Sequence, residues 1–301
     1  MVVVGLTGDV GAGKSTLAHL WSGMGATVVS ADAIVARLWN SPDILDAVRK
    51  RLGPDVFDEE GRARRAAVAE RVFADDETYR WLNDLFHPPV LEEMERLVSA
   101  ASRWVVAEIP LLFEVGVPWW MDLVVFVTAP EEIRAARNEY RGIGREALLL
   151  RERRLFSSEE KKARSRFVLE NGADLETFRR KGRALGLLLR AMAELLSVEC
   201  PCASREEALS LARMLVRENL AACTHIVPVE SVFRWKSVVE TEAEHLLVAT
   251  TTERLFPVLR ERLLAAHSYE LPVITAREVR RGNAAALEWI VRSCVAPTEP
   301  S

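Results

Sequence analysis

The sequence lacks the features that would place the protein in a membrane, on nucleic acid or outside the cell. None of its apolar runs is long enough to span a bilayer, and the apolar N-terminus carries no basic leader. The formal net charge of the 301 residues is −4, which does not suggest a nucleic-acid-binding protein. We therefore expect a cytoplasmic protein with neither a membrane nor a nucleic-acid partner.

Cysteine is scarce and unevenly placed. The four cysteines all lie in the last third of the chain: Cys200, Cys202, Cys223 and Cys294. In the cytoplasm these thiols should be reduced. Because the chain is long enough for two domains, this distribution indicates that its two parts differ in character.

A Gly/Pro-rich linker between the two parts is also absent. A helix expected over residues 174–194 runs almost directly into an expected strand. We therefore expect one domain over residues 1–194, a second over 195–297, and a disordered tail over 298–301.

The most informative stretch that is present runs from Gly8 to Ser15. It fits the phosphate-binding pattern G-x-x-x-x-G-K-[ST], between an apolar run typical of a strand and a helical pattern. A plain turn would not need Lys14 and Ser15 after the last glycine. The glycines let backbone N–H groups face phosphate oxygens, Lys14 can reach the β and γ phosphates, and Ser15 can bind Mg²⁺. The motif predicts an ATP·Mg²⁺ site that includes Gly8, Gly11, Ala12, Gly13, Lys14 and Ser15.

Short apolar runs alternate with amphipathic helical patterns through the first domain. Strands are expected over residues 2–6, 26–29, 104–109 and 123–127. This alternation is typical of an α/β fold, in which helices cover both faces of a parallel sheet. Ligands bind at the carboxyl ends of such strands, so the residues after each strand are candidates for function.

Ser30-Ala31-Asp32 follows the second expected strand. A carboxylate at this place, close to the phosphate loop, could accept a proton from an attacking hydroxyl group. Aspartate is also a favoured helix N-cap, and the residues alone leave both interpretations open.

An arginine-rich helical region covers residues 134–166. Guanidinium groups can hold phosphate, and a helical lid could shut water out of the site. Most of these side chains are expected on a solvated helix with i,i+4 ion pairs, with two or three functional arginines among them.

Several motifs of the first domain occur in the order and spacing of one known family, dephospho-coenzyme A kinase, which the domain therefore resembles. The motifs are Gly5-Leu6-Thr7-Gly8, residues 11–16, Ser30-Ala31-Asp32, Gly61, Arg65, residues 81–88, Pro110-Leu111-Leu112-Phe113-Glu114, residues 158–161 and Asn171-Gly172. The sequence departs from the family at Ser30, Ile133 and Leu155, and Arg137 and Arg141 are shifted by about one residue.

The resemblance implies an α/β P-loop kinase domain with a helical lid that converts ATP and dephospho-CoA into ADP and CoA. Asp32 would accept the proton of the ribose 3′-hydroxyl, while Lys14, Mg²⁺ on Ser15 and the lid residue Arg145 stabilise the transferring group. ATP would also contact Thr16 and Asn171. The acceptor would be bound by Asp32, Arg65, His87, Pro110, Leu111, Glu114 and Arg151, with His87 at a His-Pro helix boundary.

The second part predicts a β-α-β-β-α-β order with a terminal helix, which is an α+β ferredoxin-like domain. Its motifs resemble the divalent-cation tolerance family, CutA. They are Leu220-Ala221-Ala222-Cys223, residues 231–235, residues 242–244, residues 267–272 and Trp289. The resemblance implies a homotrimer formed by strand pairing between subunits.

Metal binding by the second domain is a further hypothesis. Cys200-Pro201-Cys202 places two thiols at the end of a strand, where they could hold Cu(I) or Zn²⁺. Glu244 and His267 are the other candidate ligands, whereas Cys223 is expected to be a small buried apolar residue.

The prediction is a dephospho-CoA kinase fused to a CutA-like trimerising domain, with a divalent-metal response as the suggested role of the latter. Two alternatives stay open: a P-loop kinase for another hydroxyl acceptor, and an ATP-sensing binding protein whose output is the second domain. The second domain could also be purely structural.

Overall fold

The computed structural model describes residues 1–101, 103–140, 144 and 153–295. They form two compact units, one of Val3–Gly182 and one of Met1–Val2 with the chain from Arg183 onward. The division falls within helix α10 (Leu175–Ala193). Among all the described residues, no helix has both the length and the apolar character needed to cross a bilayer.

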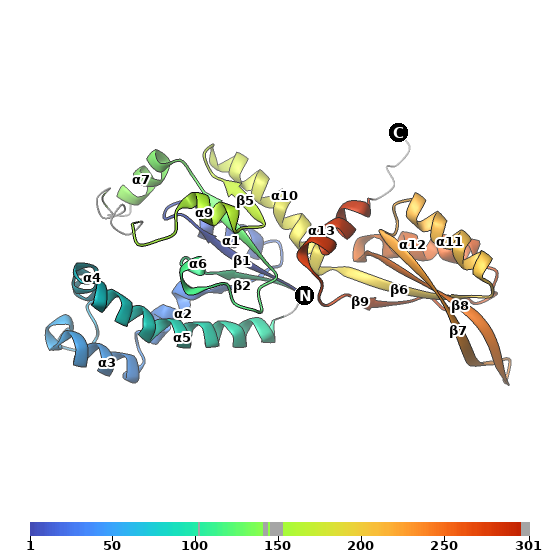
Figure 1. Ribbon diagram of the computed structural model, residues 1–301, viewed down its shortest axis with the longest axis horizontal. Helices are drawn as coiled ribbons and strands as arrows, with labels where there is room; N and C mark the ends of the chain where they lie inside the picture. The colour runs from blue at the N-terminus through green and yellow to red at the C-terminus, as the bar shows by residue number, and fades with distance from the viewer. Residues whose placement is uncertain (102, 141–143, 145–152, 296–301) are drawn as a thin grey trace. The chain divides into compact units, whose positions relative to one another are not determined.

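The first unit is built on a five-stranded parallel sheet in the order β2-β3-β1-β4-β5 (Figure 1). The strands are β1 (Val2–Gly8), β2 (Thr27–Ser30), β3 (Trp104–Glu108), β4 (Leu123–Thr128) and β5 (Phe167–Glu170). Every residue of β1, β3 and β4 is buried, which explains why these central strands are almost continuous apolar runs. The predicted α/β fold is confirmed, with β5 as a strand that the sequence had not indicated.

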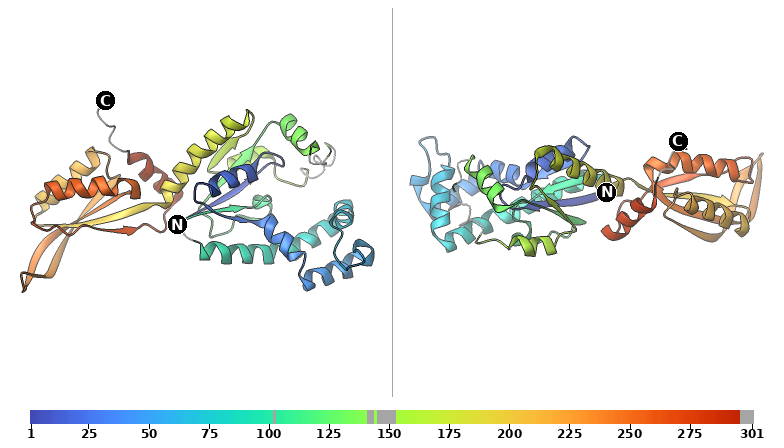
Figure 2. Two further views of the ribbon diagram at one scale, coloured as in Figure 1. Left: turned by 180° about the vertical axis from the view of Figure 1, so that it is seen from behind. Right: turned by 90° about the horizontal axis from the view of Figure 1, so that it is seen from above.

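Helices flank this sheet on both faces (Figures 1 and 2). They are α1 (Lys14–Ser22), α2 (Ala31–Leu38), α3 (Pro42–Leu52), α4 (Arg65–Ala74), α5 (Asp76–Ala100), α6 (Leu112–Val115), α7 (Glu131–Glu139), α9 (Ser158–Ala163) and the first part of α10. Trp21 on α1 is fully buried and donates its indole N–H to the carbonyl of Gly182 on α10 at 2.8 Å. A methyl group on Gly182 would lie 2.6 Å from Leu17, so glycine permits this close packing of the two helices.

Helix α5 continues without a break through Pro88 and Pro89. The expectation that His87 marks a helix boundary is therefore wrong. Proline removes a backbone donor and crowds the preceding turn, which usually ends a helix. Here the buried side chains on both sides of the prolines lie four residues apart and form one apolar stripe, Phe86, Val90, Met94 and Val98.

The second unit contains the rest of α10 and an antiparallel sheet in the order β7-β8-β6-β9, with further helices. The elements are β6 (Leu195–Cys202), α11 (Arg205–Arg217), β7 (Cys223–Trp235), β8 (Val238–Thr252), α12 (Phe256–Ala266), β9 (Thr275–Glu278) and α13 (Ala284–Ser293). A two-residue turn, Lys236-Ser237, joins β7 to β8, and both residues have positive φ, as tight hairpins require. The predicted ferredoxin-like order is confirmed.

Candidate active site

The phosphate loop connects β1 to α1 at the carboxyl edge of the parallel sheet. Gly11 and Gly13 have φ angles of 78° and 107°, which side chains other than glycine rarely adopt. A Cβ atom on Gly13 would also lie 2.6 Å from the Asn171 amide nitrogen. Gly13 is the N-cap of α1 and supplies no side-chain acceptor, so no N-cap side chain occupies the first N–H groups of this helix. These N–H groups are suited to bind an anion.

Lys14 lies across this loop. Its ammonium group donates hydrogen bonds to the carbonyl oxygens of Gly8 at 3.0 Å and Asp9 at 3.1 Å. Burial lowers the pKa of Lys14, whereas the nearby carboxylates of Glu108, Asp32 and Asp9 act to raise it. The three carboxylates therefore lie within electrostatic range of the lysine. Lys14 and Asp32, two of the predicted site residues, thus lie in the same region of the structure.

Ser15 Oγ donates a hydrogen bond to Glu108 Oε1 at 2.8 Å. Glu108 is the last residue of β3 and is 7% exposed. The sequence prediction missed this residue, although a lone carboxylate inside the apolar run over residues 104–109 was a visible signal. A hydroxyl and a carboxylate side by side are the hard oxygen ligands that Mg²⁺ prefers.

Asp32 lies in the first turn of α2 and its side chain is exposed. The N-cap of this helix is Ser30, whose hydroxyl accepts the backbone N–H of Ala33 at 3.4 Å. The Asp32 carboxylate is therefore not the residue that caps the helix.

The segment after β3 is anchored by two of its predicted site residues. The carbonyl of Pro110 accepts a hydrogen bond from Thr7 Oγ1 at 3.1 Å. Glu114 forms a buried ion pair with Lys161 on α9, with Oε1 and Nζ 2.9 Å apart. The other oxygen of Glu114 is buried and has no hydrogen-bond partner among the described residues. Leu111, next to Pro110, is half-buried.

Asn171, which follows β5, supports the phosphate loop. Its amide nitrogen donates to the carbonyl of Ala12 at 2.8 Å, and its side-chain oxygen accepts from Arg137 of α7 at 3.3 Å. Arg137 also reaches the carbonyl of Gly11 at 3.4 Å. Thr16, by contrast, is an exposed residue of the first turn of α1.

Two predicted acceptor residues lie on the helices that follow β2. Arg65 begins α4 and donates to the carbonyl of Ala36 on α2 at 3.3 Å. His87 is half-buried on α5, and burial lowers its pKa, while Asp84 opposes this shift. Arg141, Arg145 and Arg151 lie outside the described residues.

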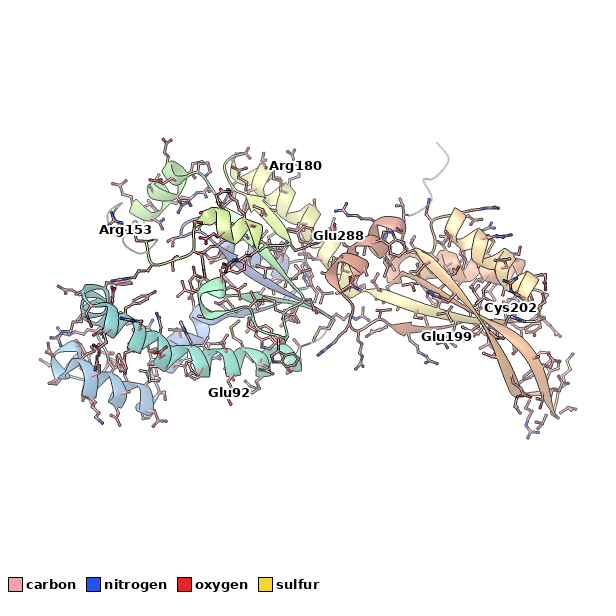
Figure 3. The ribbon with its side chains drawn as sticks, viewed as in Figure 1. Glu92, Arg153, Arg180, Glu199, Cys202 and Glu288 are labelled. Atoms are coloured by element: carbon pink, nitrogen blue, oxygen red, sulfur yellow. The ribbon has the colours of Figure 1, made fainter. Side chains whose placement is uncertain are left out.

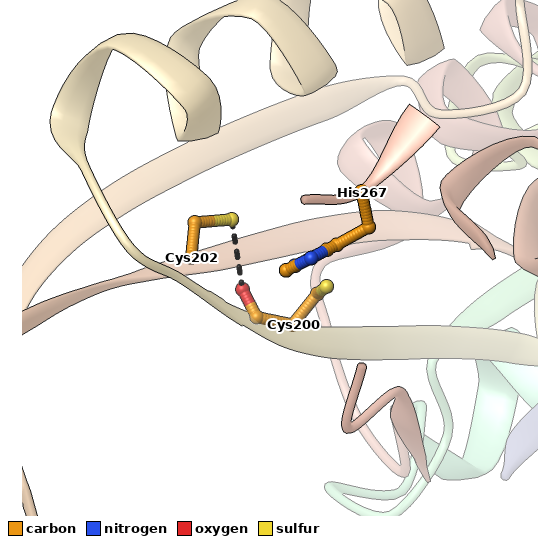
Figure 4. A group of neighbouring side chains, drawn as sticks. All are labelled: Cys200, Cys202 and His267. Atoms are coloured by element: carbon orange, nitrogen blue, oxygen red, sulfur yellow. Dashed lines mark hydrogen bonds between the residues drawn. The ribbon is translucent and has the colours of Figure 1, made fainter. Parts of the chain in front are cut away.

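The second unit contains a group of three possible metal ligands, Cys200, Cys202 and His267 (Figure 4). The two cysteines lie two positions apart on β6, on the same face of the strand, and Cys202 is its last residue (Figure 3). Both cysteines are buried. The two sulfur atoms and a nitrogen of His267 all lie within 4.8 Å of one another. The neighbouring Cys202 thiol and burial raise the pKa of Cys200, so a metal ion would have to displace a tightly held proton.

The imidazole of His267 already has hydrogen bonds at both nitrogens. Nδ1 accepts the backbone N–H of Tyr269 at 3.1 Å, so the proton of the neutral ring is on Nε2, 2.9 Å from the carbonyl oxygen of Pro201. A bound metal ion would replace one of these hydrogen bonds. Glu244, the fourth predicted ligand, is outside the group and accepts a hydrogen bond from the Tyr269 hydroxyl at 2.6 Å. Burial and this carboxylate raise the pKa of Tyr269.

Comparison with known families finds a different family model for each of the two parts of the chain. A family model described as dephospho-CoA kinase matches residues 2–177, and one described as CutA1 divalent ion tolerance protein matches residues 196–293. The dephospho-CoA kinase of Corynebacterium diphtheriae is 37% identical over 192 residues, 62% of this chain and 96% of that protein. The dephospho-CoA kinase of Deinococcus radiodurans is 43% identical over 178 residues, 58% of this chain and 85% of that protein.

Solved structures match each part separately. Protein TT1252 from Thermus thermophilus covers 61% of this chain and 95% of its own, with 36% identity and a TM-score of 0.53. The divalent cation tolerance protein Cut A1 from the same species covers 34% of this chain and 99% of its own, with 38% identity and a TM-score of 0.33.

Proposed function

The chain belongs to the dephospho-CoA kinase family, and we propose that its first domain transfers the γ-phosphoryl group of ATP to the ribose 3′-hydroxyl of dephospho-CoA. The observation that carries this proposal is the grouping of Lys14, Asp32 and Glu108 around one phosphate loop. Such a grouping combines a phosphate-binding cation, a candidate proton acceptor and a candidate metal ligand.

Each residue grouped around the loop has its own role in the proposed reaction. Lys14 leaves the carbonyls of Gly8 and Asp9 and binds the β and γ phosphates, where charge develops during transfer. Asp32 orients the 3′-hydroxyl and accepts its proton as the new O–P bond forms and the bond to the ADP oxygen breaks. Ser15 and Glu108 fit Mg²⁺, which supplies positive charge to the phosphates when bound.

The acceptor side of the proposed site draws on the helices that follow β2 and on the segment after β3. We assign Arg65, His87, Pro110, Leu111 and Glu114 to dephospho-CoA. The unpartnered oxygen of Glu114 supports this assignment, because it leaves one buried hydrogen-bond acceptor for a substrate donor. Arg145 and Arg151 complete the proposal, on the strength of the sequence pattern alone.

The test is ADP release from ATP·Mg²⁺ by the full chain, with and without dephospho-CoA. We expect release that depends on dephospho-CoA and falls by about 10²-fold or more in both Lys14→Ala and Asp32→Asn. Asp43→Asn is the matched control, because Asp43 is also an exposed first-turn aspartate, on α3. Release without dependence on dephospho-CoA would indicate another hydroxyl acceptor, and ATP binding without release would indicate a nucleotide sensor.

For the second domain we propose a homotrimer formed by strand pairing between subunits. The supporting observation is that β7 is an edge strand and that its hairpin with β8 exposes apolar side chains. Val232, Val238 and Val239 are 68%, 58% and 59% exposed. Among the described strands the outer edge of β7 is unpaired, and such an edge can pair with a strand of another chain. Light scattering should give the mass of three chains, and a monomer would contradict the proposal.

We also propose that Cys200, Cys202 and His267 bind Cu(I) or Zn²⁺, because their ligand atoms converge within 4.8 Å. Competition titrations with each metal should give one site per chain, lost in the Cys200→Ser/Cys202→Ser double variant. Cys294→Ser is the control, because Cys294 is buried but outside this group. Equal binding by wild type and double variant would rule out this ligand set, and no binding by either would favour a structural role for the second domain.

A further inference from the structure

Asp9, the first residue after β1, is held in place through its backbone. Its N–H donates to the carbonyl of Val127 on β4 at 3.0 Å. Its carbonyl accepts the N–H of Ala12 at 3.2 Å and the Lys14 ammonium at 3.1 Å. These bonds fix the point at which the phosphate loop leaves the sheet.

The Asp9 side chain is also held, and by two different elements. Its Oδ2 accepts a hydrogen bond from Thr128 at the end of β4, and its Oδ1 accepts one from Ser158 at the start of α9, each at 2.7 Å. The residue is only 8% exposed. A buried carboxylate that receives one hydroxyl on each oxygen has a single favourable orientation. Asp9 therefore links the phosphate loop both to the sheet and to α9.

Helix α9 carries a positive charge into this region. Lys161 on α9 forms the buried pair with Glu114, so the helix is held at this residue and at Ser158. The charge of Lys161 also acts on Lys14 in the direction that lowers the pKa of Lys14. The position of α9 consequently influences the positive field at the residue that contacts the phosphates.

The loop is held from a second helix as well. Asn138 of α7 donates to the carbonyl of Val10 at 3.3 Å, and Arg137 of α7 reaches that of Gly11 at 3.4 Å. Three consecutive loop residues, 9–11, are thus contacted by α9 and α7, the helices that follow and precede residues 140–157 in the sequence. Among these contacts, only that of Asp9 is made by a loop side chain.

We propose that Asp9 is a positioning residue for phosphoryl transfer, whose carboxylate holds α9 and Lys161 in register with the phosphate loop. This inference rests on the proposed function of the first domain. Asp9 acts through its two hydrogen bonds and not through contact with the reacting atoms. Loss of the Ser158 bond lets α9 move relative to the loop, and small misplacements of catalytic groups slow a reaction strongly.

The kinetic test compares Asp9→Ala, Asp9→Asn, Ser158→Ala and the Asp9→Ala/Ser158→Ala double variant with wild type. Ser158→Ala should lower kcat about tenfold while the KM for ATP changes less than about twofold. The double variant should be no slower than Asp9→Ala, since both changes remove the same bond. Asp9→Asn should recover most of the rate, because hydroxyls can donate to its oxygen and accept from its nitrogen.

The control is Thr78→Ala, which removes a similar hydroxyl-to-aspartate bond, 2.6 Å long, from Asp75 at the start of α5. Its kcat should match that of wild type. An unchanged kcat in Ser158→Ala, multiplied effects in the double variant, or an Asn variant as slow as Asp9→Ala would each overturn the proposal.

Amide hydrogen exchange tests the same link without relying on kinase activity. In Asp9→Ala and in Ser158→Ala, the amides of residues 158–163 should exchange at least about tenfold faster than in wild type, while those of α4 stay unchanged. Unchanged exchange in α9 would overturn the proposal. A protein that passes this test but does not phosphorylate dephospho-CoA would refute the proposed function and leave the structural link standing.

Discussion

The hydroxyl of Ser15 donates a 2.8 Å hydrogen bond to the carboxylate of Glu108, joining the first turn of α1 to the end of β3. Helix α1 follows β1, which is the neighbour of β3 in the sheet, although 93 positions separate Ser15 from Glu108 in the chain. The pair places two hard oxygen ligands beside the phosphate loop. Several expected outcomes depend on this arrangement and on the buried contacts around it.

The first prediction concerns Glu108. Glu108→Gln keeps the shape of the side chain and the hydrogen bond from Ser15 but removes the negative charge. The Mg²⁺ concentration that half-saturates the reaction should rise about tenfold or more, because the amide is a poorer ligand for a hard cation. Initial rates measured across a Mg²⁺ titration at fixed ATP check this. A variant with the Mg²⁺ dependence of wild type would remove Glu108 from the proposed site.

The second prediction concerns the conformation of the loop. Gly13→Ala should abolish measurable ATP binding, because the new methyl group meets the Asn171 amide at 2.6 Å on a backbone with a φ of 107°. Gly25→Ala is the matched control: its φ is 100°, but nothing lies within 4 Å of the added Cβ. The control should lose about 1–2 kcal/mol of stability and keep its ATP affinity. Calorimetric titration with ATP separates the two, and equal affinities would contradict the role of Gly13.

The third prediction concerns the buried ion pair of Glu114 with Lys161. Lys161→Met leaves a buried carboxylate without its cation and should lower the free energy of unfolding by about 3–5 kcal/mol. Glu114→Gln/Lys161→Met removes both charges and should cost clearly less. Urea unfolding of the three proteins gives the comparison, in which a double variant less stable than Lys161→Met would be evidence against the argument.

The fourth prediction concerns pH. Burial lowers the pKa of His87 below its ordinary value of 6.5, so the unfolded chain binds this proton more readily than the folded protein. The neutral imidazole therefore contributes stability above about pH 6.5, and this contribution is lost as the pH falls below that value. In His87→Gln the contribution is absent. The difference in unfolding free energy between wild type and variant should shrink on acidification from about pH 7.5 to 5, and a difference that does not change with pH would contradict it.

The sequence predicted the parts of the fold that depend on local pattern. The buried strands β1, β3 and β4 are continuous apolar runs, and the loop from Gly8 to Ser15 is a dense motif, so both could be located without a structure. Strand β5 could not be located from the sequence, because only one of its four residues is buried. It becomes a strand through its pairing with β4. The continuity of α5 through Pro88 and Pro89 was equally hidden, since local rules favour a break there.

The site residues that the sequence missed depend on contacts between distant segments. Glu108 stands out in the sequence as a lone carboxylate in an apolar run, but its partner Ser15 follows only from the strand order. Asp9 occupies a variable position of the motif, and only the tertiary structure places Thr128 and Ser158 on its two oxygens. The partners of both residues are fixed by tertiary structure, so the local sequence does not reveal these contacts.

We propose above that the first domain phosphorylates the 3′-hydroxyl of dephospho-CoA. The most direct test is to incubate the full chain with ATP, Mg²⁺ and dephospho-CoA and to identify the product by mass spectrometry and phosphorus NMR. We expect a product with one added phosphoryl group on the ribose 3′-oxygen, formed by wild type and by Asp43→Asn but not by Asp32→Asn. Unmodified dephospho-CoA after prolonged incubation with a protein that binds ATP, or a phosphoryl group on any other oxygen, would contradict it.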